Sequence, residues 1–403
     1  MNRNIKMTPE GTRDFLFEEC LARRRVEKSL TELFQSRGYH EVMTTTLEYY
    51  DMFSAGSAAL PQELLYKMTA GNGRLLVVRP DSTAPIARMV ATRLKDEPLP
   101  IRLYYNQPVF KKTRALSGGY NEVRQAGVEL LGASGLKADL EVLSAAVDSL
   151  ACCAVTGYKL EISHVGYFNA LLKAIPADGD TLERIRQMIE TKNFAALNDL
   201  LDSLPPCGAV EAIRRLPGMF GDIGVIEQAE SLFCNEEAKE SLRYIHTLYG
   251  LLEELGLSGR ISIDLGLVHR NEYYTGLIFQ GYMEGSGLTV LSGGRYDRLL
   301  GEFGRAMPAI GFGAEVDALA SVLLAQGEEI RREIPDVLLF SDDAHVVPAL
   351  RHAAALAKEG LTAEQCMAVT RREAEREAAL RGIPRLDIVT ETVTSISVKG
   401  EKA

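Results

Sequence analysis

The chain has 403 residues and a net charge of −10, from 45 lysines and arginines against 55 aspartates and glutamates. Its 46% hydrophobic and 25% charged residues are typical of a globular protein, and the length indicates two or three domains. The acidic balance argues against a general nucleic-acid binder, which depends on positive charge. No stretch has the roughly 20 apolar residues that a membrane-spanning helix needs.

The six cysteines are scattered and include no C-x-x-C pair, so we expect no metal and no cofactor. The adjacent Cys152 and Cys153 lie in an apolar helical stretch, where two small buried residues are a simpler interpretation than redox work. The N-terminus is polar, without an apolar signal region, and reduced thiols suit a reducing compartment. These features predict a cytoplasmic protein.

The first third of the chain predicts a helix followed by strands that pair as hairpins. Apolar residues recur at helical spacing over 14–37. A strand over 75–79 runs into Asp81-Ser82-Thr83, which are N-cap residues for a helix that reaches about Leu94. Further strands, whose hairpin pattern favours an antiparallel sheet, are expected at 40–47, 101–110 and 122–131.

The middle of the chain predicts an insertion made of helices. A helix over 136–151 and a short strand over 159–163 precede it, and residues 166–255 have helical patterns almost throughout. We therefore expect one core over 1–325 that carries this insertion. Its later strands and helices are expected at 261–265, 273–280, 288–291, 296–301, 309–312 and 315–325.

A charged and polar stretch, residues 326–333, predicts a linker. The remaining residues, 334–403, predict a small C-terminal α/β domain. Its strands and helices are expected at 336–340, 346–358, 371–381 and 386–389.

The strand over 122–131 carries an unusual set of polar residues. Side chains alternate between the faces of a strand, so Gln125, Gly127 and Glu129 share one face. The opposite face, with Ala126 and Val128, is apolar and suits packing against a helix. Burying a lone carboxylate is costly, so Glu129 needs a cation or several donors. An internal arginine and the ammonium group of a bound amino acid both fit.

Other residues have a structural interpretation beside a functional one. Asp81 and Thr83 flank a helix start, where a plain N-cap role is open. Tyr273 and Tyr274 occupy opposite-facing strand positions, so one of them can stack on a ligand or pack in the core. The paired glycines of Ser292-Gly293-Gly294-Arg295-Tyr296 let the backbone approach a ligand or another strand closely, without forming a P-loop.

Each of these features is weak alone, but their order and context together are specific. From about Lys6 to Leu324 the chain resembles the catalytic core of histidyl-tRNA synthetase, a class II synthetase. The resemblance implies an α+β fold in which helices flank an antiparallel sheet. It is carried by Arg79-Pro80-Asp81-Ser82-Thr83, Gln125-Ala126-Gly127-Val128-Glu129, Tyr273-Tyr274-Thr275-Gly276 and Ser292-Gly293-Gly294-Arg295-Tyr296-Asp297.

In that family these stretches hold histidine, so the resemblance implies a histidine pocket here. Asp81 and Thr83 correspond to residues that contact the ligand. Gln125 and Glu129 correspond to the pair that holds its ammonium group. Tyr274 and Tyr296 correspond to the tyrosines that line the imidazole side of the pocket, and Tyr273 is adjacent to Tyr274.

The departures from that family concern its ATP-handling arginines, where this chain has Lys111, His269 and Ala318. Thr45 also stands at a proline position of the dimer-forming segment. Adenylate formation needs positive charge fixed around the triphosphate, and lysine does not replace a guanidinium fork. A ligand groove without these clamps is similar to the regulatory subunits of ATP phosphoribosyltransferase, the first enzyme of histidine biosynthesis.

This second resemblance implies a subunit that is not an enzyme, is needed by a short-form ATP phosphoribosyltransferase catalytic subunit, and conveys feedback inhibition by L-histidine. It also implies a heteromultimer with a homodimeric unit, and no nucleic-acid or membrane contact. Two alternatives stay open. One is a divergent histidyl-tRNA synthetase in which Lys111, Arg114 or Arg270 supplies the missing charge, and the other is a stand-alone histidine sensor.

Overall fold

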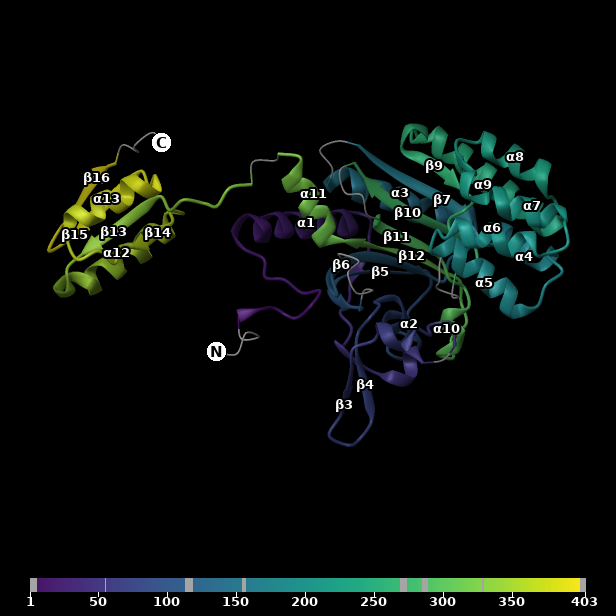
Figure 1. The fold of residues 1–403 in the computed structure, drawn as a ribbon. Helices are drawn as coiled ribbons and strands as arrows, with labels where there is room; N and C mark the ends of the chain where they lie inside the picture. Colours follow the sequence, from purple (N-terminus) through teal and green to yellow (C-terminus); the bar gives the residue numbers. More distant parts are fainter. Residues whose placement is uncertain are drawn as a thin grey trace. The chain divides into compact units, whose positions relative to one another are not determined.

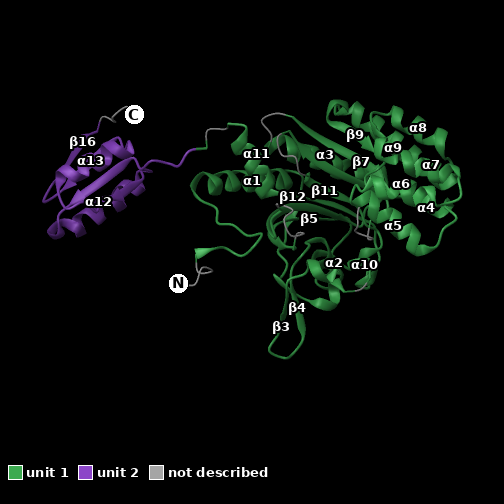
Figure 2. Cartoon of the chain, viewed as in Figure 1, with its two compact units in different colours: residues 1–330 green, residues 331–403 purple. Residues whose placement is uncertain are grey.

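The computed structural model describes residues 6–54, 56–112, 119–153, 157–268, 274–284, 289–327 and 330–398. The chain divides into two compact units, residues 1–330 and residues 331–403, which Figure 2 draws in different colours. Each unit has its own sheet and its own apolar core.

A nine-stranded sheet forms the centre of the first unit (Figure 1). Its strands are β1 (His40–Glu41), β5 (Ile101–Phe110), β6 (Glu122–Leu131), β7 (Tyr158–His164), β8 (Phe220–Gly221), β9 (Ile261–Asp264), β10 (Leu277–Met283), β11 (Thr289–Arg295) and β12 (Ala309–Glu315). They lie in the order β1-β5-β6-β12-β11-β10-β7-β9-β8. All neighbours from β5 to β7 are antiparallel, as the hairpin pattern predicts. Towards the two margins β1 runs parallel to β5 and β9 runs parallel to β7, so the whole sheet is mixed.

Three helices cover one face of this sheet, namely α1 (Phe17–Ser36), α3 (Leu136–Cys153) and α11 (Val316–Ala325) (Figure 1). They bury the apolar side of β6, including Ala126 and Val128, in the main core. Two smaller helices, α2 (Thr83–Thr92) and α10 (Leu299–Glu302), lie on the other side of the sheet. The alternation predicted for β6 therefore holds, because its apolar face meets helices and its polar face is directed away from them.

The helical insertion lies between β7 and β9, where it was expected. It is interrupted only by the two residues of β8 within the described part of the segment. Buried Asp139 of α3 ties the insertion to the core, because it accepts hydrogen bonds from Tyr244 of α9 and Arg295 of β11. The helices of the insertion are α4 (Val165–Ala174), α5 (Gly179–Glu190), α6 (Phe194–Asp202), α7 (Gly208–Arg215), α8 (Gly224–Leu232) and α9 (Glu236–Glu254).

A smaller sheet precedes α2 and consists of β2 (Leu47–Tyr49), β3 (Lys67–Thr69) and β4 (Leu75–Val78), in the order β2-β4-β3. The prediction of one continuous strand over 40–47 is wrong. The strand is interrupted after β1 ends at Glu41 and before β2 begins at Leu47. The buried guanidinium of Arg79 holds this break, since it donates to the carbonyls of Thr44 and Thr45 at 2.9 and 3.0 Å. Arg79 is thus a structural cation, satisfied by backbone oxygens.

The second unit is a four-stranded sheet of order β14-β13-β15-β16 with two helices. Its elements are β13 (Val337–Ser341), α12 (Val346–Lys358), β14 (Ala363–Gln365), α13 (Arg371–Arg381), β15 (Arg385–Val389) and β16 (Val393–Ser397). The two predicted strands and two predicted helices are present. The sequence missed β14 and β16, because β14 is three residues long and β16 is mostly exposed, so neither has a clear apolar pattern.

Candidate functional site

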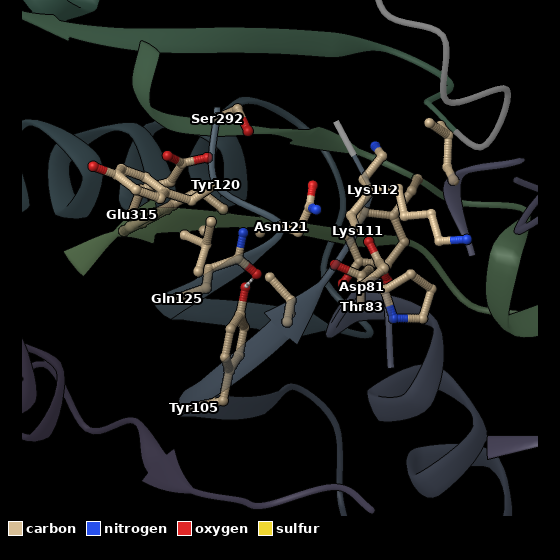
Figure 3. Close-up of a pocket in the computed structure, with 18 of the residues that line it drawn as sticks. Asp81, Thr83, Tyr105, Lys111, Lys112, Tyr120, Asn121, Gln125, Ser292 and Glu315 are labelled. Carbon is tan, nitrogen blue, oxygen red and sulfur yellow. Dashed lines mark hydrogen bonds between the residues drawn. The ribbon is translucent and has the colours of Figure 1, made fainter. Parts of the chain in front are cut away.

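The polar face of β6 forms one wall of a pocket of about 480 Å³ in the first unit (Figure 3). Strands β5, β6, β11 and β12 supply its floor and α2 one side. Five of the seven predicted ligand residues line it, from stretches far apart in the sequence. They are Asp81, Thr83, Gln125, Tyr274 and Tyr296.

Gln125 lies near the middle of the pocket, above Tyr105 of β5 (Figure 3). The Tyr105 hydroxyl donates to Gln125 Oε1 at 3.0 Å, which orients the side-chain amide. Burial, with the nearby carboxylate of Glu129 adding to it, raises the pKa of Tyr105 well above its usual value. Tyr105 therefore stays a neutral hydrogen-bond donor beneath the pocket.

Glu129 lies behind the pocket wall, where its side chain is 1% exposed. Thr83 Oγ1 donates to Glu129 Oε1 at 2.9 Å, and the Tyr296 hydroxyl donates to Oε2. Both oxygens are thus bound by residues that themselves line the pocket. The internal arginine considered for Glu129 is not its partner here; two hydroxyl groups take that place.

The environment of Glu129 favours its neutral form. Burial raises the pKa of Glu129 to about 8, and the charge of Asp81 adds to the rise, while the two hydroxyl donors oppose it. A cation placed beside this carboxylate would favour the ionised form. The site therefore holds acidic groups that a positively charged ligand would ionise.

Asp81 combines a structural role with a place in the pocket. Its Oδ1 accepts from the N–H of Ala84 at 2.9 Å, so it satisfies a free donor at the start of α2. Burial raises the pKa of Asp81, opposed by that N–H and by the charge of Lys111. The N-cap interpretation and the pocket interpretation therefore both apply to the same side chain.

Glycines of β12 leave room for neighbouring side chains at the floor of the pocket, because glycine has no side chain. A Cβ atom on Gly311 would lie 1.8 Å from Glu129 Oε2, and one on Gly313 would lie 2.6 Å from the Gln125 amide. The Gly311-x-Gly313 pattern thus serves close approach of side chains to a strand. Gly294 of β11 has the same use, since its Cβ would lie 2.7 Å from the ring of Tyr274.

The pocket also contains residues that the sequence did not single out as ligand-binding. Glu315 follows Gly311 and Gly313 on one face of β12, and that alternation could have revealed it. Burial and the neighbouring Asp317 raise the pKa of Glu315 to about 7, against the charge of Lys111. Two further such residues lie within strands, Tyr105 in β5 and Ser292 in β11, and three lie between β5 and β6, namely Lys112, Tyr120 and Asn121.

The three positions that are expected to depart from the synthetase pattern have different surroundings. Lys111 lines the pocket beside Asp81 (Figure 3). Ala318 lies on α11 and packs against the main apolar core. His269 lies outside the described residues, as does Tyr273, the seventh predicted ligand residue.

Arg295, the last residue of β11, supports the pocket without lining it. Its Nε donates to Asp139 at 2.9 Å, and its Nη1 donates to Ala133 O at 3.2 Å and to Asp297 at 3.0 Å. These contacts are buried or partly buried and keep the guanidinium within the protein. They hold the end of β11 in place, and Tyr296, the next residue, lines the pocket.

No three histidine, cysteine, aspartate or glutamate side chains in the described ranges are grouped so that they could hold a metal ion. None of the helices described here has both the length and the apolar character to cross a membrane.

Comparison with known proteins places this chain in a family. A family model described as Histidyl-tRNA synthetase matches residues 11–319. A relative from Clostridium kluyveri named ATP phosphoribosyltransferase regulatory subunit is 39% identical over 93% of this chain and 95% of its own length. A relative of the same name from Bacillus mycoides is 36% identical over 90% of this chain and 87% of its own length.

Solved structures agree with these sequence relatives. A crystal structure from Bacillus halodurans, described as an ATP phosphoribosyltransferase regulatory subunit/histidyl-tRNA synthetase, has a TM-score of 0.80 and 32% identity, covering 93% of this chain and 96% of that one. A histidyl-tRNA synthetase from a Nostoc species has a TM-score of 0.73 at 19% identity, covering 97% of both chains, which shows a shared fold alone. Because the named relatives match nearly the whole of both chains, this chain belongs to the family of ATP phosphoribosyltransferase regulatory subunits, which is built on the class II synthetase fold.

Proposed function

We propose that this chain makes no product itself and carries the histidine response of an ATP phosphoribosyltransferase, the first enzyme of histidine biosynthesis. Its partner is a short-form catalytic subunit, which couples ATP to phosphoribosyl pyrophosphate and depends on this chain for activity. The observation that supports this most is a pocket whose lining suits an amino acid, together with Lys111 and Ala318 at positions where we expect arginines in a synthetase.

Histidine is the proposed ligand because its groups match the lining. The carboxylates suit an ammonium group, the amide of Gln125 suits a polar atom, and the aromatic rings suit an imidazole. We include Glu129 as the acceptor that keeps Thr83 and Tyr296 in place. The full proposed pocket is Asp81, Thr83, Gln125, Glu129, Tyr273, Tyr274 and Tyr296.

The charges of the lining support a non-catalytic role. Lys111 and Lys112 are its cations within the described residues, against the carboxylates of Asp81 and Glu315. Phosphoryl and adenylyl transfer depend on preorganised positive charge around the phosphates. Two flexible ammonium groups beside two carboxylates provide little of it.

The assembly we propose is a heteromultimer in the cytoplasm, where this chain forms a homodimeric unit. Histidine would act by binding one state of the assembly more tightly than the other, which shifts the population towards the inhibited state. The six cysteines are all unpaired thiols, which fits a reducing compartment.

A second candidate is a divergent histidyl-tRNA synthetase. It is favoured by the synthetase family model, which matches residues 11–319. Histidine-dependent exchange between ATP and pyrophosphate by the purified chain would support it. A folded sample without such exchange would contradict the synthetase candidate and favour the regulatory proposal.

The proposal is tested by measuring phosphoribosyl-ATP formation by a short-form catalytic subunit, with and without this chain, over a range of histidine concentrations. We expect activity only when both are present, and a fall in activity as histidine rises. Activity that is independent of this chain contradicts the proposed dependence, and activity that is insensitive to histidine contradicts the proposed effector.

A further inference from the structure

Glu315 occupies a distinct place in the pocket. It is the last residue of β12 and shares a sheet face with Gly311 and Gly313, which have no side chains. Glu315 is therefore the first side chain that β12 presents to the pocket on this face, and it lies opposite Gln125 in the register of β6. Figure 3 shows Glu315 and Asp81 on opposite sides of Gln125.

Among the described residues, charges rather than hydrogen bonds act on the Glu315 carboxylate. Within the described part of the chain it interacts with Asp317, which repels it, and with Lys111, which attracts it. Asp317 is itself engaged by Arg23 of α1 at 3.1 Å and by the backbone N–H of Arg124 at 2.8 Å. Within the described residues, Lys111 is thus the cation that acts on the Glu315 carboxylate, and the carboxylate can also interact with a ligand in the pocket.

We propose that Glu315 determines which charge the pocket accepts: its carboxylate favours a ligand that brings a cation or N–H donors and rejects a ligand that carries phosphate groups. This inference rests on the proposed function and names the residue that gives the effector site its selectivity. It concerns the end of β12 beyond Gly313, where Glu315 lies next to Gln125.

The physical reason is the repulsion between like charges in a site that water screens weakly. Asp81 and Glu315 face a bound ligand from two sides, and a polyphosphate between them would meet both carboxylates. Lys111 and Lys112 offset part of this repulsion. Selectivity of this kind matters for an effector site, because the substrates of the proposed catalytic partner carry phosphates and would otherwise compete with histidine.

The test is isothermal titration calorimetry of the full chain with L-histidine and, separately, with ATP. The variants are Glu315→Gln, which removes the charge and keeps the shape, Glu315→Asp, which keeps the charge, and Glu254→Gln on the exposed surface of α9 as a matched control. We expect Glu315→Gln to bind ATP about tenfold or more tightly than the wild type, since one like charge is removed. Glu315→Asp and Glu254→Gln should reject ATP as the wild type does.

A measurement on the unmodified chain supports the same test if a variant does not fold. Acidification from pH 8 to pH 6 neutralises Glu315 and should strengthen ATP binding to the wild type. Glu129 loses its charge over the same range, so the wild type is compared with Glu129→Gln, which should keep most of the pH effect.

Unchanged ATP affinity in Glu315→Gln, or ATP binding by Glu315→Asp as well, overturns the charge selectivity. Failure of the wild type to bind histidine contradicts the proposed effector instead. The two failures are distinguishable because the ATP titrations do not require histidine to bind.

Discussion

The hydrogen-bond partners of a residue in this site can lie far away in the sequence, so adjacent residues do not predict its role. Glu129 falls on the polar face of β6, as strand alternation predicts, yet its partners Thr83 and Tyr296 are 46 and 167 residues away in the chain. Its neutral form is favoured by burial and not by any local motif. The carboxylate predicted to contact a ligand accepts hydrogen bonds from two residues that line the pocket.

The raised pKa of Glu129 predicts how stability depends on pH. The ordinary pKa of a glutamate is 4.5 and that of Glu129 in the fold is about 8, so between these values the folded state holds a proton that the unfolded state has lost. The free energy of unfolding should therefore fall as the pH rises through this window. Glu129→Gln cannot ionise and should lose this part of the dependence.

Urea unfolding at pH 6 and pH 8.5 measures this effect. Buried Asp81 and Glu315 contribute with the same sign, so the difference between the wild type and Glu129→Gln is the informative quantity. Parallel pH dependence of the two proteins contradicts the assignment to Glu129.

The glycine floor predicts a steric effect at one position. Gly311→Ala places a Cβ atom 1.8 Å from Glu129 Oε2 and 2.4 Å from Val128 O, so the strand or the carboxylate must move. We expect a loss of about 1–3 kcal/mol in the free energy of unfolding, together with weaker histidine binding. Denaturant unfolding and calorimetric titration check both.

A matched control lies in α9, where Gly250 has open space around its Cβ position. Gly250→Ala should leave histidine binding unchanged and stabilise the chain by up to about 1 kcal/mol, because alanine favours a helix interior. Equal effects of the two substitutions would contradict the steric explanation.

Elements of this fold are joined by a few buried polar contacts. Asp139 of α3 receives hydrogen bonds from Arg295 of β11 and from Tyr244 of α9, so it joins the sheet, its covering helix and the insertion. Similarly, Arg79 holds the break between β1 and β2 through the carbonyls of Thr44 and Thr45. Local patterns predicted β5 and β6 at their observed bounds, but they could not predict this break, because its cause lies more than 30 residues further along the chain.

The hydrogen bonds to Asp139 predict that removing the Arg295 guanidinium destabilises the fold more than removing the Tyr244 hydroxyl does. Arg295→Met removes the cation and leaves Asp139 charged and buried, which should cost about 3–5 kcal/mol. Tyr244→Phe removes one hydrogen bond to a charged group and should cost about 1.5–3 kcal/mol. Denaturant unfolding of both variants checks the order, and an equal or reversed order contradicts the role of Arg295 as the main counter-charge.

The whole molecule consists of two units with separate cores. The clusters of the second unit draw only on residues from 337 to 398, whereas those of the first unit end at Ile330. The boundary between the two units lies between residues 330 and 331, in a charged and polar stretch of the sequence. Each unit buries its own apolar surface, which is the condition for independent folding.

This division predicts that a chain ending at Ile330 folds and binds histidine as the full chain does. Each described pocket residue belongs to the first unit, and its supporting contacts do too. Calorimetric titration checks the affinity, and differential scanning calorimetry should show the loss of one transition. A large drop in affinity would show that the second unit supports the pocket.

Short-range pattern was enough to predict the long strands and the helical segment between β7 and β9, and sequence motifs singled out five of the residues that line the pocket. These follow from side-chain periodicity and from motifs a few residues long, which any chain segment carries by itself. Long-range packing decided which of the residues line the cavity, which stand behind it and which buried ions join the elements. Burial, charge and hydrogen bonding depend on neighbours in space, so the hydrogen bonds to Glu129 and the place of Glu315 in the pocket arise only when distant strands come together.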